Sequence, residues 1–132
     1  MKKSIVSASL ILGLSFIGTG CARTVPMYDL PQQEVQQKVS QKDVYKAIVR
    51  AAGQRGWSVQ KVKEGLLEAT YAKRDFSVTI NIIYTATSYD INYKDSTGLK
   101  YNAADSTIHK NYNSWIKNLE QSINRELMLL NI

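Results

Sequence analysis

The chain of 132 residues is 44% hydrophobic and 21% charged, with a formal net charge of +6 at pH 7. Once a leader and a spacer are set aside, about 90 residues are left, which is enough for one small domain. The modest basic excess favours anionic surfaces only weakly. The chain lacks the dense run of Lys and Arg that binds nucleic acid, so nucleic acid is not an expected partner.

The N-terminal residues 1–20 have the three parts of a secretory signal. Lys2 and Lys3 give a positive start, the segment Ile5–Ile17 is apolar, and the small residues 18–20 precede Cys21. The apolar segment is shorter than the roughly 20 residues that a membrane-spanning helix needs. Residues 1–20 are therefore predicted to be a signal peptide that directs export.

Cys21 is the only cysteine, so it has no partner for a disulfide within the chain. Its position directly after Thr19 and Gly20 resembles the lipobox of bacterial lipoproteins, although Gly18 stands where that family usually has Leu. The resemblance implies that Cys21 is acylated, with palmitate among the acyl groups, and anchors the chain in a membrane. Ala22, in place of Asp, implies the outer membrane facing the periplasm. The alternative is an ordinary signal peptide whose cleavage leaves a free cysteine.

Residues 21–39 are predicted to hold the lipidated cysteine and a tether. Both prolines of the chain, Pro26 and Pro31, lie in this stretch, and the Gln-rich run 32–37 follows them. Proline and polar residues without a clear period are typical of linkers. The stretch is expected to act as a spacer between the lipid and a single domain of residues 40–132.

Hydrophobic periodicity predicts that this domain is α+β. Ser40 is expected to cap a helix over Gln41–Gln54, and Asp105 or Ser106 to cap a second, amphipathic helix. Four strands are expected between them, at about Trp57–Val62, Leu66–Ala72, Phe76–Tyr84 and Tyr89–Lys94. Residues 94–98 are expected to form a turn or loop. The expected architecture is a four-stranded antiparallel meander with two helices packed on one face, in the order α-β-β-β-β-α.

The expected turns also predict which residues face each other across the hairpins. The later hairpin pairs Tyr84 with Tyr89, Ile82 with Ile91 and Ile80 with Tyr93. The earlier hairpin, with its turn at Lys73–Arg74, pairs Tyr71 with Phe76, Ala69 with Val78 and Leu67 with Ile80. All these side chains share one face, and the opposite face is expected to be polar and wet.

Two segments of the sequence resemble segments of a known group of proteins. The runs Tyr89–Ser96 and Ile108–Ile116 are similar to those of a group of small bacterial envelope lipoproteins without an assigned activity. The similarity covers about Val44 to Leu127 and implies an envelope location, but it supplies no catalytic or ligand-binding residue. The expected fold is also similar to small periplasmic α+β modules of envelope-assembly lipoproteins.

A basic stripe recurs every four residues along the first helix and the residues before it. One interpretation is contact with anionic lipid headgroups, or with an acidic envelope partner, close to the anchor. The other is an ordinary solvated helix face opposite an apolar one. The stripe consists of Lys38, Lys42, Lys46 and Arg50.

Tyrosines are numerous for a domain of this size. One interpretation is a ligand groove between helix and sheet with hydroxyl groups at its rim. The other is core packing in which each hydroxyl group reaches the edge of the core. The tyrosines concerned are Tyr71, Tyr84, Tyr89, Tyr93 and Tyr101.

His109 is the only histidine, and Asp105 and Ser106 are close to it in sequence. Three neighbours on one helical turn rarely form a catalytic triad, because a triad needs an aligned nucleophile and an oxyanion hole. Capping residues beside a half-exposed histidine are the simpler interpretation. No catalytic residue, metal site or cofactor is therefore predicted, since the carboxylates are scattered and no phosphate-binding loop is present.

The leading functional hypothesis is a membrane-anchored, non-catalytic interaction or accessory module of the bacterial cell envelope, with an envelope protein as its partner. The alternative is a module that binds a small ligand or lipid in a groove between helix and sheet. An enzyme is a third hypothesis, which would require a cleft holding a carboxylate or histidine with a perturbed pKa.

Overall fold

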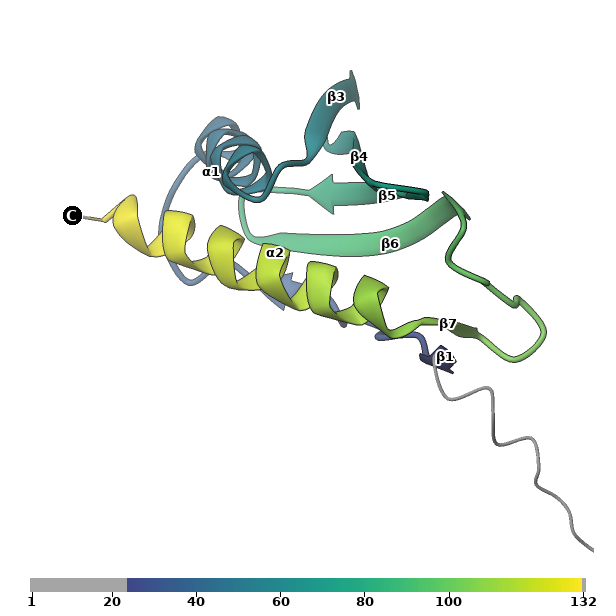
Figure 1. Cartoon of the computed structure of the whole chain (residues 1–132). Helices are drawn as coiled ribbons and strands as arrows, with labels where there is room; N and C mark the ends of the chain where they lie inside the picture. The colour runs from purple at the N-terminus through teal and green to yellow at the C-terminus, as the bar shows by residue number, and fades with distance from the viewer. Residues whose placement is uncertain (1–23, 132) are drawn as a thin grey trace, which may run out of the picture.

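The computed structural model describes residues 24–131, which form an α+β fold. Helices α1 (Gln41–Gln54) and α2 (Lys110–Leu129) pack on one face of an antiparallel sheet with strand order β2-β6-β5-β4-β3 (Figure 1). A second sheet of two strands, β1 and β7, lies at one end of the molecule. The strands are β1 (Thr24–Pro26), β2 (Gln33–Glu34), β3 (Ser58–Lys63), β4 (Leu66–Lys73), β5 (Phe76–Tyr84), β6 (Ser88–Thr97) and β7 (Thr107–His109).

The α+β class and the two helices are confirmed, whereas the four-stranded meander is wrong. The large sheet has five strands, because β2 adds to the outer edge of β6. Strand β6 also extends to Thr97, so residues 94–97 are not the expected turn. The strand continues past a bulge that places Lys94 between two paired positions, which keeps Asp95 opposite Thr79 and Tyr93 opposite Ile80.

Helix α1 has the expected bounds, and its start is fixed by a capping box. The Ser40 hydroxyl group accepts a hydrogen bond from the N–H of Asp43 at 3.1 Å, and the Asp43 carboxylate accepts one from the N–H of Ser40 at 3.2 Å. These bonds satisfy N–H groups that have no partner within the helix. The buried face of α1 is narrow and consists of Val44, Ala47, Ile48, Ala51 and Ala52.

The capping box predicts a pH-dependent part of the stability. Hydrogen bonding to the backbone and side chain of Ser40 lowers the pKa of Asp43 below its ordinary value of 3.8. A lowered pKa stabilises the fold above the unfolded value, and this contribution is lost as pH falls through the folded value. We expect Asp43→Asn to destabilise the protein at neutral pH, and the difference from wild type to shrink in strong acid. Urea unfolding at both pH values tests this, and a difference that does not change with pH would contradict it.

The hairpin of β5 and β6 has the predicted register, with Tyr84 opposite Tyr89 and Ile82 opposite Ile91. The hairpin of β4 and β5 does not, because Ala69 faces Ile80 rather than Val78. Its turn is centred on Arg74 and Asp75, one position later than expected, and Arg74 takes a positive φ of 58°. The partner therefore shifts by two residues, and the apolar side chains still share one face because side chains alternate with a period of two.

The N-terminal lead, residues 24–39, belongs to the fold and is not a spacer. Val25 of β1 pairs with Ile108 of β7, and Gln33 of β2 pairs with Tyr89 of β6. Leu30 and Val35 are only 4% and 9% exposed and lie in the same core as the helices and the sheet. The sequence of the lead suggested a linker because its two buried side chains follow no regular period.

Helix α2 begins later than expected. Its N-cap is His109, whose Nδ1 accepts a hydrogen bond from the N–H of Asn111 at 3.1 Å. Asp105 and Ser106 do not cap it, because residues 103–106 form a turn that leads into β7. Ile108, which a cap at Asp105 or Ser106 would place in the helix, is instead a buried residue of β7.

Candidate functional site

The candidate site lies at the outer edge of strand β6, on the side away from β5. The N–H of Thr85 donates to the carbonyl of Ser88, and the N–H of Val35, in the lead, donates to the carbonyl of Thr87. Backbone groups of alternate residues in an antiparallel strand point to the same neighbour. The N–H and C=O groups of Tyr89, Ile91 and Tyr93 therefore point away from β5 and toward the lead.

Pairing of the lead with β6 stops early, and a proline explains why. Gln33 faces Tyr89, so the same register would set Pro31 opposite Ile91. Proline has no N–H group and cannot donate to the carbonyl of Ile91. The ladder ends at Gln33, and among the described residues the backbone groups of Ile91 and Tyr93 have no strand partner on this side.

A hollow of about 280 Å³ lies where the lead and β6 separate. We call it the β6 notch. Its wall combines strand β6, the lead, the turn before β7 and the first turn of α2. The lining residues are Met27, Tyr28, Asp29, Ile91, Asn92, Tyr93, Ser106 and Tyr112.

Two polar groups of the β6 notch lack partners within residues 24–131. The side chain of Tyr112 is only 2% exposed, yet its hydroxyl group makes no hydrogen bond there. The exposed carboxylate of Asp29 makes neither a hydrogen bond nor an ion pair there. Because Tyr112 lines the notch and its hydroxyl group makes no hydrogen bond to the described residues, that hydroxyl group is a candidate ligand contact.

Electrostatics keep the tyrosines of the notch in their neutral form. Burial is the main cause that raises the pKa of Tyr112, and Tyr93 and Asp29 raise it further. Burial likewise raises the pKa of Tyr93, whose hydroxyl group is 2.6 Å from the hydroxyl group of Ser96. Both tyrosines are therefore protonated at neutral pH, and the Tyr112 hydroxyl group can donate as well as accept a hydrogen bond.

The wall formed by the lead is held in place by α2. The side-chain oxygen of Asn113 accepts from the N–H of Tyr28 at 2.8 Å, and its NH₂ group donates to the carbonyl of Pro26 at 3.0 Å. The Tyr28 hydroxyl group donates to Glu120 at 2.9 Å, and Lys117 lies 5.0 Å from the centre of its ring. These contacts fix the notch before any ligand enters. Sequence reasoning missed Asn113, because its partners lie more than 80 residues away in the chain.

The five tyrosines of the expected groove do not line one site. Tyr84 and Tyr89 are fully buried in the core, and the hydroxyl group of Tyr84 has no hydrogen-bond partner among the described residues. Tyr93 and Tyr101 contact each other, with ring centres 4.2 Å apart, but only Tyr93 lines the β6 notch. Tyr71 lies elsewhere, between Trp57 and Trp115.

A second, smaller hollow of about 150 Å³ contains these aromatic rings. Tyr71 packs 5.4 Å from Trp57 and 4.9 Å from Trp115, and Arg55 and Asn118 complete the lining. Arg55 is itself held by a hydrogen bond of 2.8 Å from its Nε to the hydroxyl group of Ser122. The aromatic rings pack against one another, so ring packing where α1, β4 and α2 meet accounts for this hollow without a ligand.

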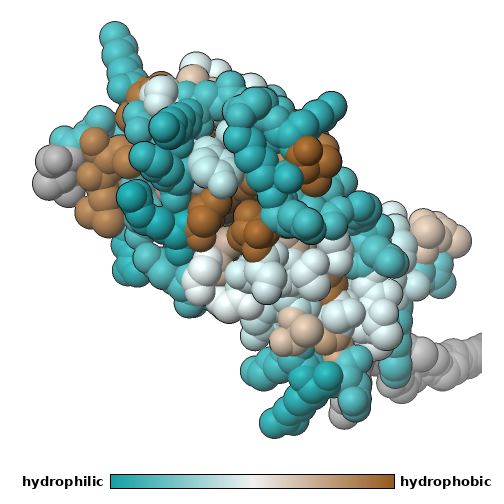
Figure 2. Space-filling model, turned by 90° about the horizontal axis from the view of Figure 1, so that it is seen from above, coloured by the Kyte–Doolittle hydropathy of each residue, from teal (hydrophilic) through white to brown (hydrophobic). Residues whose placement is uncertain are grey.

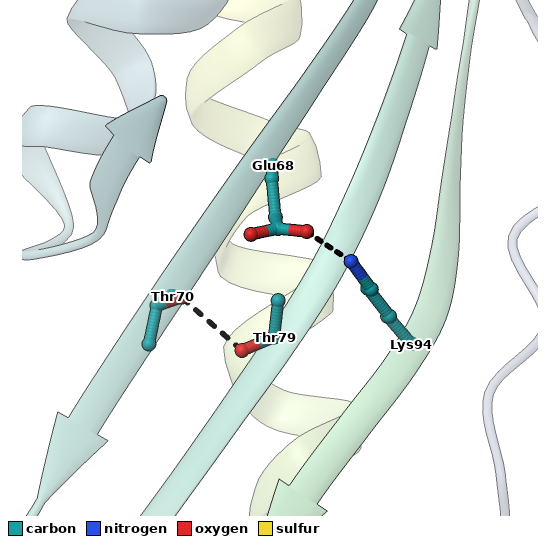
Figure 3. A network of polar contacts seen from close by, with 4 residues as sticks. All are labelled: Glu68, Thr70, Thr79 and Lys94. Carbon is teal, nitrogen blue, oxygen red and sulfur yellow. Dashed lines mark hydrogen bonds and ion pairs between the residues drawn. The ribbon is translucent and has the colours of Figure 1, made fainter. Parts of the chain in front are cut away.

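The sheet face opposite the helices is polar, as expected. Figure 3 shows Glu68 paired with Lys94 across strand β5, and the hydroxyl groups of Thr70 and Thr79 in contact at 3.1 Å. Helix α2 lies behind the sheet in this view, so these side chains point away from the core. Ile83, which is 44% exposed, and Leu66, which is paired opposite it, are apolar exceptions on this face.

The side chains of the basic stripe, Lys38, Lys42, Lys46 and Arg50, are all exposed. Helix α1 lies at the opposite end of the molecule from β1 and β7 (Figure 1). In Figure 2 the surface seen from above is mainly hydrophilic, with separate apolar groups, and one of these lies at the C-terminal end of α2. Met128 and Leu129, 62% and 50% exposed, belong to that end.

His109 is 7% exposed rather than half-exposed, and its ring contacts that of Phe76 at 5.4 Å. Its Nδ1 serves the cap of α2. Within residues 24–131, no three His, Cys, Asp or Glu side chains are grouped so as to hold a metal ion. Cys21 and the predicted signal peptide lie outside the described residues. Of the two helices described, neither is long and apolar enough to cross a bilayer.

Comparisons with protein-family models, with curated proteins and with solved structures found nothing that matches this chain.

Proposed function

We propose that the chain is an exported lipoprotein, anchored through acylated Cys21, that acts as a non-catalytic interaction module of the bacterial cell envelope, at the periplasmic face of the outer membrane. One structural observation supports this proposal in addition to the sequence of the predicted signal peptide. Strand β1 begins at Thr24, three residues after Cys21, and is paired with β7. Extended chain covers at most about 3.6 Å per residue, so Thr24 lies within about 11 Å of the cysteine. Acyl chains on Cys21 would hold the folded body itself at the bilayer surface.

This arrangement would fix which end of the domain faces the membrane. The end that carries β1 and β7 faces the bilayer, and the basic stripe lies at the far end with α1. The stripe is then placed to meet an acidic partner rather than the headgroups beside the anchor. Long-range attraction of this kind increases the rate of encounter and weakens as ionic strength rises.

Replacement of Cys21 by serine tests the anchor. With a palmitate analogue supplied to the growing bacteria, we expect the wild-type chain to carry the label and to sediment with membranes. We expect Cys21→Ser to lose the label completely and to move into the soluble fraction, because a lost acyl chain removes about 0.8 kcal/mol of membrane affinity per buried methylene. Gly18→Leu, which supplies the residue usual in the lipobox, is the matched control and should retain the label. An unlabelled, soluble wild-type chain would refute the anchor.

Crosslinking in intact cells tests the interaction role separately. A photoreactive residue at Lys46, on the exposed stripe, should give a reproducible crosslinked envelope protein, and one at Thr79, on the polar sheet face, is the control. Failure of the Lys46 position to give a reproducible partner would count against an interaction module even if Cys21 is acylated.

The alternative, a module that binds a small ligand, is favoured by a different feature from the one expected. The tyrosines do not form a shared groove between helix and sheet. The β6 notch favours this alternative, because within residues 24–131 the backbone groups of Ile91 and Tyr93 have no strand partner on this side and the Tyr112 hydroxyl group makes no hydrogen bond.

A further inference from the structure

We propose that the β6 notch binds an extended segment of a partner polypeptide, which adds a short strand to the outer edge of β6 and places a basic side chain beside Asp29. The proposal rests on the proposed role as an interaction module and names the chemistry by which that module recognises its partner.

The backbone of β6 carries the first part of this proposal. The N–H and C=O groups of Ile91 and Tyr93, two residues that line the notch, point away from β5 and have no strand partner on that side within residues 24–131. An exposed strand edge of this kind pairs readily with an extended peptide, whose main chain supplies the hydrogen bonds. The unpaired stretch runs from Asp90 to the bulge after Tyr93, or about 13 Å at roughly 3.3 Å per residue. A segment of about four residues therefore fits.

The other free edge of the large sheet, on β3, is a poorer site. Its strand has a bulge between Lys61 and Lys63, and both lysines are exposed. Bulges and lysines are the features that keep edge strands from pairing with other chains. The β6 edge has its bulge only at its far end, so the edge beside the notch lacks this protection.

Side chains of the notch set the chemistry of the segment. The hydroxyl group of Tyr112, which lines the notch, makes no hydrogen bond within residues 24–131, so a carbonyl or N–H group of the peptide would pair with it. Asp29 is acidic and has no cationic partner there, so it favours a Lys or Arg side chain on the peptide. Met27 and Ile91 offer apolar contact for a neighbouring aliphatic side chain.

The test is an NMR titration of the full mature chain in detergent, acylated or not. The probes are hexapeptides of alternating Thr and Val with one central Lys, and matched controls carry Glu in its place. A second control carries N-methyl groups on the amides that would face β6. We expect the Lys peptides to slow hydrogen exchange of the Ile91 and Tyr93 amides by about fivefold or more, as one new hydrogen bond of about 1 kcal/mol requires. The Glu and N-methylated peptides should bind more weakly.

Two variants assign the contacts. Asp29→Asn should weaken the Lys peptides by about threefold and abolish their advantage over the Glu peptides, because it removes one exposed charge pair. Tyr112→Phe should weaken both series by about fivefold, because it removes one hydroxyl group and nothing else. Asp75→Asn, at an exposed acid of the β4–β5 turn, is the matched control and should change neither series.

Several outcomes would overturn the proposal. These are N-methylated peptides that bind as well as the parent, protection at β3 in place of β6, and no protection of Ile91 and Tyr93 at saturating peptide. Each is independent of acylation, because palmitate labelling of the wild-type chain and Cys21→Ser reports the anchor alone. Acylation without peptide binding would leave the membrane anchor standing and remove only the strand-addition site.

Discussion

Leu30→Ala is expected to lower the free energy of unfolding by about 2–4 kcal/mol, the range for truncation of a buried leucine. Leu30 lies ten residues before Ser40, where the domain was expected to begin, yet it is 4% exposed within the shared core. Its removal leaves a cavity between the lead and the helices that rigid neighbours fill only partly. Urea unfolding followed by circular dichroism measures the loss, and the slope of the transition should stay unchanged.

Gln32→Ala is the matched control for this experiment. Gln32 is in the same lead and is exposed, so its truncation should change stability by no more than about 0.5 kcal/mol. If Leu30→Ala had as small an effect as Gln32→Ala, the lead would not be part of the cooperative folding unit. The β6 notch would then lack a fixed wall, and the strand-addition proposal would weaken with it.

Gly98→Ala should destabilise the protein by about 2–4 kcal/mol, since left-handed backbone alone costs a non-glycine residue about 1–2 kcal/mol. Gly98 has a φ of +79°, and an added Cβ would lie 2.6 Å from the carbonyl oxygen of Asp75. That oxygen belongs to the backbone of the β4–β5 turn and cannot move away cheaply. The turn and the end of β6 would both have to shift.

Gly53→Ala is a control that is expected to change the stability in the opposite direction. Gly53 is in the last turn of α1, and an added Cβ there would meet nothing within 4 Å. Alanine is favoured over glycine in a helix by up to about 1 kcal/mol, so this variant should be slightly more stable than wild type. Thermal unfolding of both variants checks the pair, and a similar loss in each would contradict the close packing inferred at Gly98.

Local signals predicted the parts of the fold that depend on neighbours in the chain. The cap at Ser40 and Asp43 lies within one helical turn, and the hairpin of β5 and β6 is fixed by a turn of a few residues. The β4–β5 register was missed by two residues, because Arg74 adopts a left-handed conformation that is uncommon for a residue other than glycine. Nothing in the local sequence distinguishes that turn from the one expected.

The lead and the notch depend on contacts that span most of the chain. Tyr28 is held by Asn113 and Glu120, which no periodic pattern connects to it. The tyrosines show the same limit of local sequence signals. The sequence shows that tyrosines are abundant, but it does not show that they lie in three separate places, namely the core, the notch and the aromatic hollow. Pro31 is typical of a linker in sequence, but in the fold its missing N–H group ends the pairing of β2 with β6.

The short distance between Cys21 and β1 also limits how far the proposed module reaches. Helix α2 starts directly after β7, and its 20 residues span about 30 Å at 1.5 Å per residue. If the end with β1 and β7 rests on the membrane, Met128 and Leu129 lie at most about 30 Å above the lipid. Because β1 begins three residues after Cys21, the domain can move little further away. Such a protein cannot search the periplasm for a distant binding partner. Its partners would have to be proteins that themselves reside at, or are brought to, the same membrane surface.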